Sequence, residues 1–155
     1  MFGMRARRRS VRRPMTSETE AIASGIRDEL RALRDHIRHL HGGMVASADG
    51  MVIAHDLPDI EPDGLAALTA AAIGVAKRLT DATGQGGFEE SLTRGSRGYI
   101  AAYAAGNRAV LTAVAGPETN VGRLHLQARR TAARIATLLD APPGSPANQR
   151  AALAD

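Results

Sequence analysis

The chain has 155 residues (16.3 kDa), of which 44% are hydrophobic, and this length is typical of one domain with a buried core. It contains no cysteine and no tryptophan, which excludes disulfides, thiolate metal ligands and cysteine nucleophiles. No stretch has the roughly 18 apolar residues of a transmembrane segment, and no apolar run follows the basic N-terminus as in a secretion signal, so we expect a cytoplasmic protein.

The net charge of +4 is concentrated at the N-terminus. Without the six arginines of the first thirteen residues, 14 basic residues would face 16 acidic ones. We expect residues 1–16 to be a disordered tail, which is either only solvated or binds nucleic acid or another acidic surface. Its arginines are Arg5, Arg7, Arg8, Arg9, Arg12 and Arg13.

The first expected element is an amphipathic helix over residues 18–39. Ser17 and Glu20 have the spacing of a capping box, and Gly42 and Gly43 are typical of a helix end. Apolar residues recur between them at intervals of three and four, as on one face of a helix: Ile22, Ile26, Leu30, Leu33, Ile37 and Leu40.

The stretch "MVASADGMVIAHDL" predicts a hairpin, with strands over residues 44–46 and 51–54. Its centre is the pair Asp49 and Gly50, one of the strongest short signals for a tight turn. A loop rich in proline and acids follows and leads into a second helix over residues 62–83, which Gly84 ends.

Three more strands are expected over residues 88–94, 97–104 and 108–115, with glycine-containing turns between them. A last helix over residues 120–140 carries the apolar stripe Leu124, Ala128, Ala132, Ile135 and Leu139, and residues 141–155 are expected to be a flexible tail. The order α-β-β-α-β-β-β-α predicts an α+β domain at residues 17–140, with an antiparallel sheet covered on both faces.

The middle helix is apolar on all sides, since Thr69 is the only polar side chain between Gly64 and Ala76. We expect its stripe of larger residues to pack on the sheet: Leu65, Leu68, Ala72, Val75, Ala76 and Leu79. The other side carries Ala67, Ala70, Ala71 and Gly74, where small residues permit a close approach of another backbone. A second copy of the chain is the commonest partner for such a face. The alternative is an exposed helix rich in alanine.

No catalytic or metal site is evident. His36, His39, His41 and His55 lack a carboxylate or cysteine that would complete a metal site, and we interpret them as surface residues. His125 stands alone on the last helix and is interpreted as a flank of its apolar stripe. The run "TGQGG" lacks the lysine of a phosphate loop. Glu89 and Glu90 are adjacent in an expected strand, so we expect them on opposite faces. We therefore predict no enzymatic activity, no cofactor and no metal.

The element order, together with "VASADGMVIA", "GGFEESLTRGSRGYIAAYAAGNRAVLTAVA" and "NVGRLHLQARRTAARIATLL", resembles a roadblock (dynein-light-chain-type) domain in its bacterial form, over residues 20–140. The resemblance implies a profilin/longin-like fold in which a five-stranded antiparallel sheet carries the middle helix on one face and the terminal helices on the other. It also implies a homodimer through the middle helix and the edge strand at residues 88–94. The predicted interface consists of Ala67, Ala70, Ala71, Gly74, Arg78, Phe88, Glu90 and Leu92.

Bacterial members of this family usually act as partners or regulators of Ras-like small GTPases, often alongside a sensor kinase. The resemblance therefore implies a non-enzymatic dimeric scaffold that binds a small GTPase. Two alternatives remain open: an adaptor for nucleic acid or an acidic surface that acts through the arginine tail, and a small-molecule sensor with a pocket beneath the hairpin.

Overall fold

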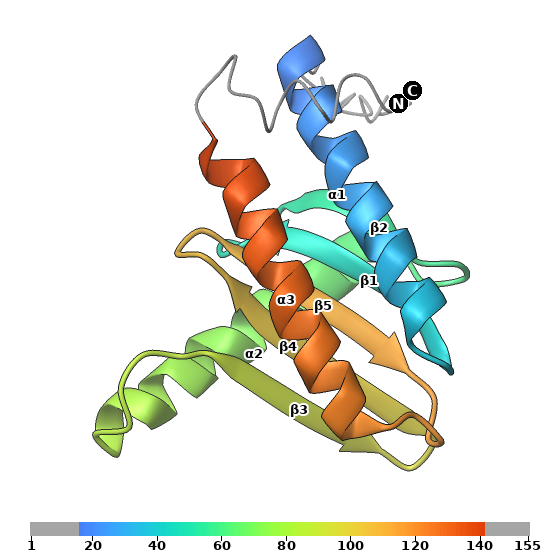
Figure 1. Ribbon diagram of the computed structural model, residues 1–155. Helices are drawn as coiled ribbons and strands as arrows, with labels where there is room; N and C mark the ends of the chain where they lie inside the picture. Colours follow the sequence, from blue (N-terminus) through green and yellow to red (C-terminus); the bar gives the residue numbers. More distant parts are fainter. Residues whose placement is uncertain (1–15, 142–155) are drawn as a thin grey trace, which may run out of the picture.

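The computed structural model describes residues 16–141, which form three helices and five strands (Figure 1). The tails predicted for residues 1–16 and 141–155 lie outside this range, except for Thr16 and Ala141. The observed order confirms the predicted α+β class. In chain order the elements are α1 (Ser17–His36), β1 (Leu40–Ser47), β2 (Val52–Asp56), α2 (Pro62–Ala82), β3 (Glu90–Gly95), β4 (Gly98–Ala105), β5 (Ala109–Ala115) and α3 (Val121–Asp140).

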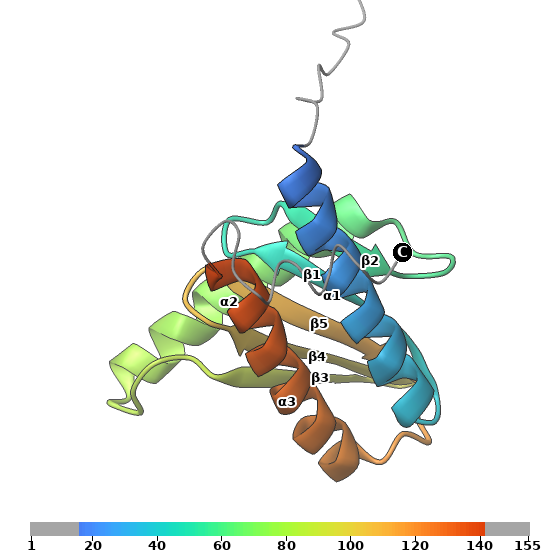
Figure 2. The same ribbon diagram turned by 45° about the horizontal axis from the view of Figure 1, so that its top comes forward.

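All five strands belong to one antiparallel sheet in the order β2-β1-β5-β4-β3. Helices α1 and α3 lie side by side on one face, and α2 lies on the other (Figures 1 and 2). An ion pair between Arg134 of α3 and Glu29 of α1, with 2.8 Å between Nε and Oε2, joins the paired helices. This arrangement confirms the profilin/longin-like fold and places β3 at an edge of the sheet.

The main core lies between the sheet and the pair α1 and α3. Tyr103 and Leu111 from the sheet are buried there among leucine and isoleucine side chains of both helices. Alanines on β4, β5 and α3 fill the space between them, which keeps the helices close to the sheet because a methyl group takes little room. The buried residues of the two helices include Ile26, Leu30, Leu33, Leu124, Ala128, Ala132 and Ile135.

Both ends of α1 differ from the prediction. The N-cap is Thr16, whose side chain accepts a hydrogen bond from the Thr19 amide, so Ser17 is already helical. The helix ends at His36, and His39 has a positive φ of 68° where the chain turns into β1. Ile37 and Leu40 are buried from the turn and the strand, which is why the apolar periodicity continued past the true end of the helix.

The Asp49–Gly50 hairpin is confirmed between β1 and β2. The Ser47 amide donates to the Met51 carbonyl over 2.8 Å, and Gly50 takes a φ of 91° that a side chain would strain. A Cβ atom at Gly50 would lie 3.3 Å from the Cβ atom of Ala70, so the tip of the hairpin rests against α2. The hairpin therefore helps to position that helix.

Within residues 16–141, none of the helices has both the length and the apolar character that crossing a bilayer requires.

Candidate interaction surface

One side of α2 is apolar and exposed. Leu68, Val75 and Leu79 have exposed fractions of 71%, 60% and 62%. Beside them, nothing lies within 4 Å of the position that a Cβ atom would take at Gly74. We call this surface the α2 outer face, made up of Ala67, Leu68, Ala71, Gly74, Val75, Arg78 and Leu79, all of them exposed.

The prediction of which stripe of α2 contacts the sheet is wrong. The buried residues of the helix are Ala66, Thr69 and Ile73, and Ile73 packs with a small cluster on β4 and β5. The predicted stripe of Leu65, Leu68, Ala72, Val75, Ala76 and Leu79 is instead mostly exposed, and only Leu65 and Ala76 are half-buried. Apolar periodicity cannot distinguish the two sides when both are apolar, and the assumption that the larger side chains face the sheet failed.

The exposed apolar side chains of the outer face are typical of an interaction surface. Burial of one leucine or valine side chain contributes about 1.5–3 kcal/mol, and a contiguous exposed apolar patch is typical of a binding site. The charged residues Lys77 and Asp81 are exposed near the end of the helix. A polar rim around an apolar centre is the usual composition of a protein interface.

The sheet is also incompletely covered near its β3 edge. Ile100 on β4 is 39% exposed on the face next to α2. Leu92 on β3 is 40% exposed on the other face, because it pairs with the core residue Ala101. β3 pairs with β4 on one side only, so its other side offers backbone donors and acceptors to a further strand. An exposed apolar helix and a free strand edge thus occur in the same part of the molecule (Figures 1 and 2).

The structure places the eight predicted interface residues in two groups. Ala70 is half-buried against the hairpin, Phe88 packs on the cluster around Ile73, and Glu90 is half-buried beneath α3. The remaining five are exposed: Ala67, Ala71, Gly74, Arg78 and Leu92. Their role in an interface remains a prediction.

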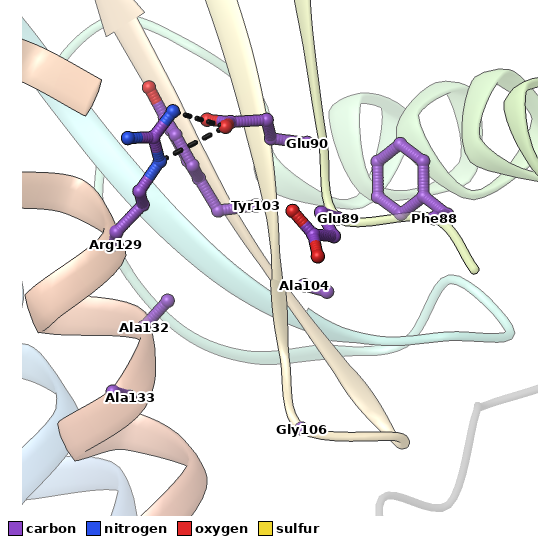
Figure 3. A pocket seen from close by; sticks show the side chains of 9 residues that line it. All are labelled: Phe88, Glu89, Glu90, Tyr103, Ala104, Gly106, Arg129, Ala132 and Ala133. Carbon is purple, nitrogen blue, oxygen red and sulfur yellow. Dashed lines mark hydrogen bonds and ion pairs between the residues drawn. The ribbon is translucent and has the colours of Figure 1, made fainter. Parts of the chain in front are cut away.

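A shallow groove of about 360 Å³ lies between α3 and the start of β3 (Figure 3). Along it, Arg129 of α3 donates from Nε to Glu90 Oε1 over 3.0 Å and from a terminal nitrogen to the same oxygen. This hydrogen bond raises the pKa of Arg129. Burial, and the nearby charge of Glu90, raise the pKa of Tyr103 well above its ordinary value of 10.0.

Two predictions about this region need correction. His125 is half-buried beside Leu124 of the apolar stripe, but it does not stand alone, because its Nδ1 atom lies 2.7 Å from the hydroxyl oxygen of Tyr103. Glu89 precedes β3 and does not alternate with Glu90, and both residues line the groove. The sequence indicates that His125 and Arg129 are one helical turn apart on α3. It does not indicate that the pairing of β3 with β4 places Glu90 opposite Tyr103, under these two side chains.

The histidines considered as metal ligands are dispersed. His36 contacts the Ala32 carbonyl of its own helix, and His39 lies 3.5 Å from Glu118. Among the residues that the structure describes, no three potential ligands lie close enough to hold a metal ion. The "TGQGG" segment is the connection from α2 to β3, with positive φ at Gly84 and Gly86.

Comparison with known proteins identifies the family. The Roadblock/LC7 domain model matches residues 26–115, so the chain belongs to the Roadblock/LC7 domain family. It is 30% identical over 95 residues to the uncharacterized protein MJ0714 of Methanocaldococcus jannaschii, covering 61% of this chain and 80% of that protein.

Two solved structures share the fold. A Roadblock/LC7 domain from Streptomyces avermitilis has a TM-score of 0.68 at 18% identity, covering 72% of this chain and 94% of that one. A structure of MglB with a tetrameric arrangement has a TM-score of 0.71 at 22% identity, covering 80% of this chain and 91% of that one. At these identities the likeness establishes the fold.

Proposed function

We propose that this protein is a non-enzymatic homodimeric scaffold that binds and modulates a Ras-like small GTPase. The observation that carries the homodimer is the α2 outer face, where three large apolar side chains are mostly exposed in a single chain. A symmetric pair of α2 helices would cover both outer faces at once. The free edge of β3 lies beside them, so two copies can also extend the sheet.

Family membership and self-association in a relative support this assembly. The chain belongs to the Roadblock/LC7 domain family, and the MglB structure with the same fold has a tetrameric arrangement. The GTPase part rests on what is usual for bacterial members of the family, which is a weaker basis than the geometry of a site. The domain limits at residues 17–140 are part of the same proposal.

Sedimentation of the full chain tests the homodimer. At micromolar concentration we expect twice the chain mass of 16.3 kDa. Gly74→Glu places a charge in the centre of the outer face at a position where a Cβ atom has no neighbour within 4 Å, so the variant is expected to be monomeric and folded. Gly122→Glu is the matched control, because Gly122 is an exposed glycine of α3 away from α2, and it is expected to stay dimeric. A parent chain that sediments as a monomer would refute the homodimer.

GTP hydrolysis and nucleotide exchange test the GTPase part. Purified Ras-like GTPases from the same organism are mixed with the parent chain and with Gly74→Glu, and both rates are measured in single turnover. We expect one GTPase to change its rate with the parent chain. If none of them binds or changes rate, this part of the proposal fails while the homodimer is unaffected.

The clustering of six arginines at the N-terminus favours a second candidate, an adaptor for nucleic acid or an acidic surface. Its binding to duplex DNA or to anionic vesicles would weaken steeply with salt and disappear on deletion of residues 1–14. Binding that is absent at low salt, or that survives this deletion, would refute the second candidate.

A further inference from the structure

The residue pattern of the edge strand β3 is symmetric about Leu92. From Glu90 to Arg94 the strand reads ESLTR. Opposite charges thus lie at the two ends, small hydroxyl side chains lie inside them, and an apolar side chain lies at the centre. Leu92 is 40% exposed, and Arg94 is exposed and forms no ion pair with any residue that the structure describes. Both side chains are available for contact with another chain.

The faces of the sheet limit how two β3 strands can meet. Leu92 pairs with the core residue Ala101 of β4, on the face that α1 and α3 cover, and Glu90 and Arg94 share that face. In the proposed homodimer both α2 helices lie on one side of a continuous sheet. Each residue of β3 must then meet a partner residue that points to the same face. A symmetric pair of strands is therefore centred on a residue and never between two residues.

Backbone hydrogen bonding selects one of these centres. The Ala104 amide donates to the Glu89 carbonyl over 2.8 Å, so every second residue from Glu89 onwards bonds to β4. Glu90, Leu92 and Arg94 lie between those residues and direct their amides and carbonyls to the free side of the strand. A pair centred on Leu92 matches all of these groups with one another. A shift of the centre by one residue in either direction places one of them opposite a residue outside the strand.

The register centred on Leu92 also matches the side chains. Leu92 lies opposite the partner subunit's Leu92, so each covers exposed surface of the other. Glu90 lies opposite the partner subunit's Arg94, and opposite charges across antiparallel strands are favourable. Glu90 is held in place for this contact, because Arg129 of α3 donates to its Oε1 atom over 3.0 Å (Figure 3).

We propose that two copies pair through β3 in the register centred on Leu92, and that the two Glu90–Arg94 contacts between subunits select a second copy of this chain as the partner. The register rests on the proposed homodimer and adds to it the residues that determine specificity. Because the symmetry repeats each contact, one substitution at position 94 changes the charge at both ends of the paired strands.

Disulfide formation tests the register, since the chain has no native cysteine. Opposite residues of a hydrogen-bonded pair have Cα atoms about 5.5 Å apart, within the range of a disulfide. Under mild oxidation we expect Leu92→Cys to form a covalent dimer faster than Ser91→Cys or Thr93→Cys, whose cysteines would be displaced from each other along the strands. Faster crosslinking at position 91 or 93 would overturn the register.

Arg94→Glu tests the charge contacts, because it places carboxylates opposite each other at both ends of the paired strands. Its dissociation constant should rise by about tenfold or more. Arg97→Glu is the matched control, since Arg97 is exposed in the turn after β3, and it should change the constant by less than about twofold. Equal effects of the two variants would overturn the charge selection.

A mixture of two charge variants should restore the dimer. Glu90→Arg is combined with Arg129→Glu, so that the ion pair within the chain is kept in reversed order. Mixed with Arg94→Glu, this double variant again brings opposite charges together at both ends. A mixture that binds no more tightly than Arg94→Glu alone would overturn the charge selection.

Sedimentation of the parent chain separates the register from the homodimer. A monomeric parent would refute both. A dimeric parent that forms no disulfide at position 92, or that tolerates Arg94→Glu, would refute this inference alone and leave the homodimer standing.

Discussion

Leu79→Ala separates the assembly of the chain from its folding. Leu79 is 62% exposed, so truncation should change the free energy of unfolding of a single subunit by less than about 0.5 kcal/mol. Alanine also has a high helix propensity, which keeps α2 intact. If Leu79 packed on the sheet, as the sequence pattern predicted, truncation would lower the free energy of unfolding much more. The structure contradicts that packing, because Leu79 is exposed.

The effect on the dimer should be large. Complete burial of an exposed leucine contributes about 1.5–3 kcal/mol, and about two thirds of that surface remains to be buried here. Each dimer loses two such side chains, so we expect a loss of about 2–4 kcal/mol, or on the order of 30-fold to 700-fold in the dissociation constant.

Sedimentation equilibrium over a range of concentrations measures this dissociation constant, and urea unfolding of the dilute chain measures the stability of the subunit. Ile73→Ala is the matched comparison, because Ile73 is 4% exposed on the sheet side of the same helix. Its loss of about 2–5 kcal/mol should appear in unfolding. An unchanged dissociation constant for Leu79→Ala, or a loss of subunit stability as large as that of Ile73→Ala, would refute the reasoning.

Three further predictions concern the fold. Tyr103→Phe removes the hydrogen bond between Tyr103 and His125 and should lower the free energy of unfolding by about 1 kcal/mol, as measured by thermal unfolding. Because the pKa of Tyr103 is raised in the folded chain, its contribution to stability is complete below pH 10.0 and is lost as the pH rises above that value, and Tyr103→Phe should remove this alkaline loss. Thr112→Val should be neutral or stabilise the chain by up to about 1 kcal/mol in urea, since the buried Thr112 hydroxyl has no partner among the described residues, whereas Thr131→Val loses a hydrogen bond from Arg134 and should destabilise. Gly42→Ala should cost about 1–3 kcal/mol because its Cβ atom would clash with the Asp56 carbonyl, while Gly95→Ala, with its nearest atom 3.7 Å away, should cost much less.

The sequence predicted most of the fold because its local signals agree with one another. The Asp49–Gly50 turn, the predicted start of the last helix at residue 120 and the glycine after α2 each mark an element boundary that the structure has within one or two residues. At α1 the signals conflicted. Ile37 and Leu40 continue the helical spacing, yet they are buried from a turn and a strand.

The candidate site was less predictable, because it depends on which elements meet. When a helix is apolar on every side, its periodicity does not indicate which side packs on the sheet. In α2 the side that packs on the sheet is the one with Ala66 and Ile73. The link from Glu90 to α3 spans 39 residues of sequence and forms only once β3 is the edge strand. A single sequence contains no record of such a contact.

The most direct test of the central claim is the distance between two α2 helices in solution. The chain has no native cysteine, so Lys77→Cys provides a single spin-label site at the edge of the outer face. Helices packed 8–10 Å apart and crossing near Gly74 should place the two labels within about 25 Å of each other. A label at Arg130→Cys, on the exposed side of α3, should give a longer distance. A dimer that shows the shorter distance at position 130, or a chain that shows no coupling between labels at position 77, would contradict the account.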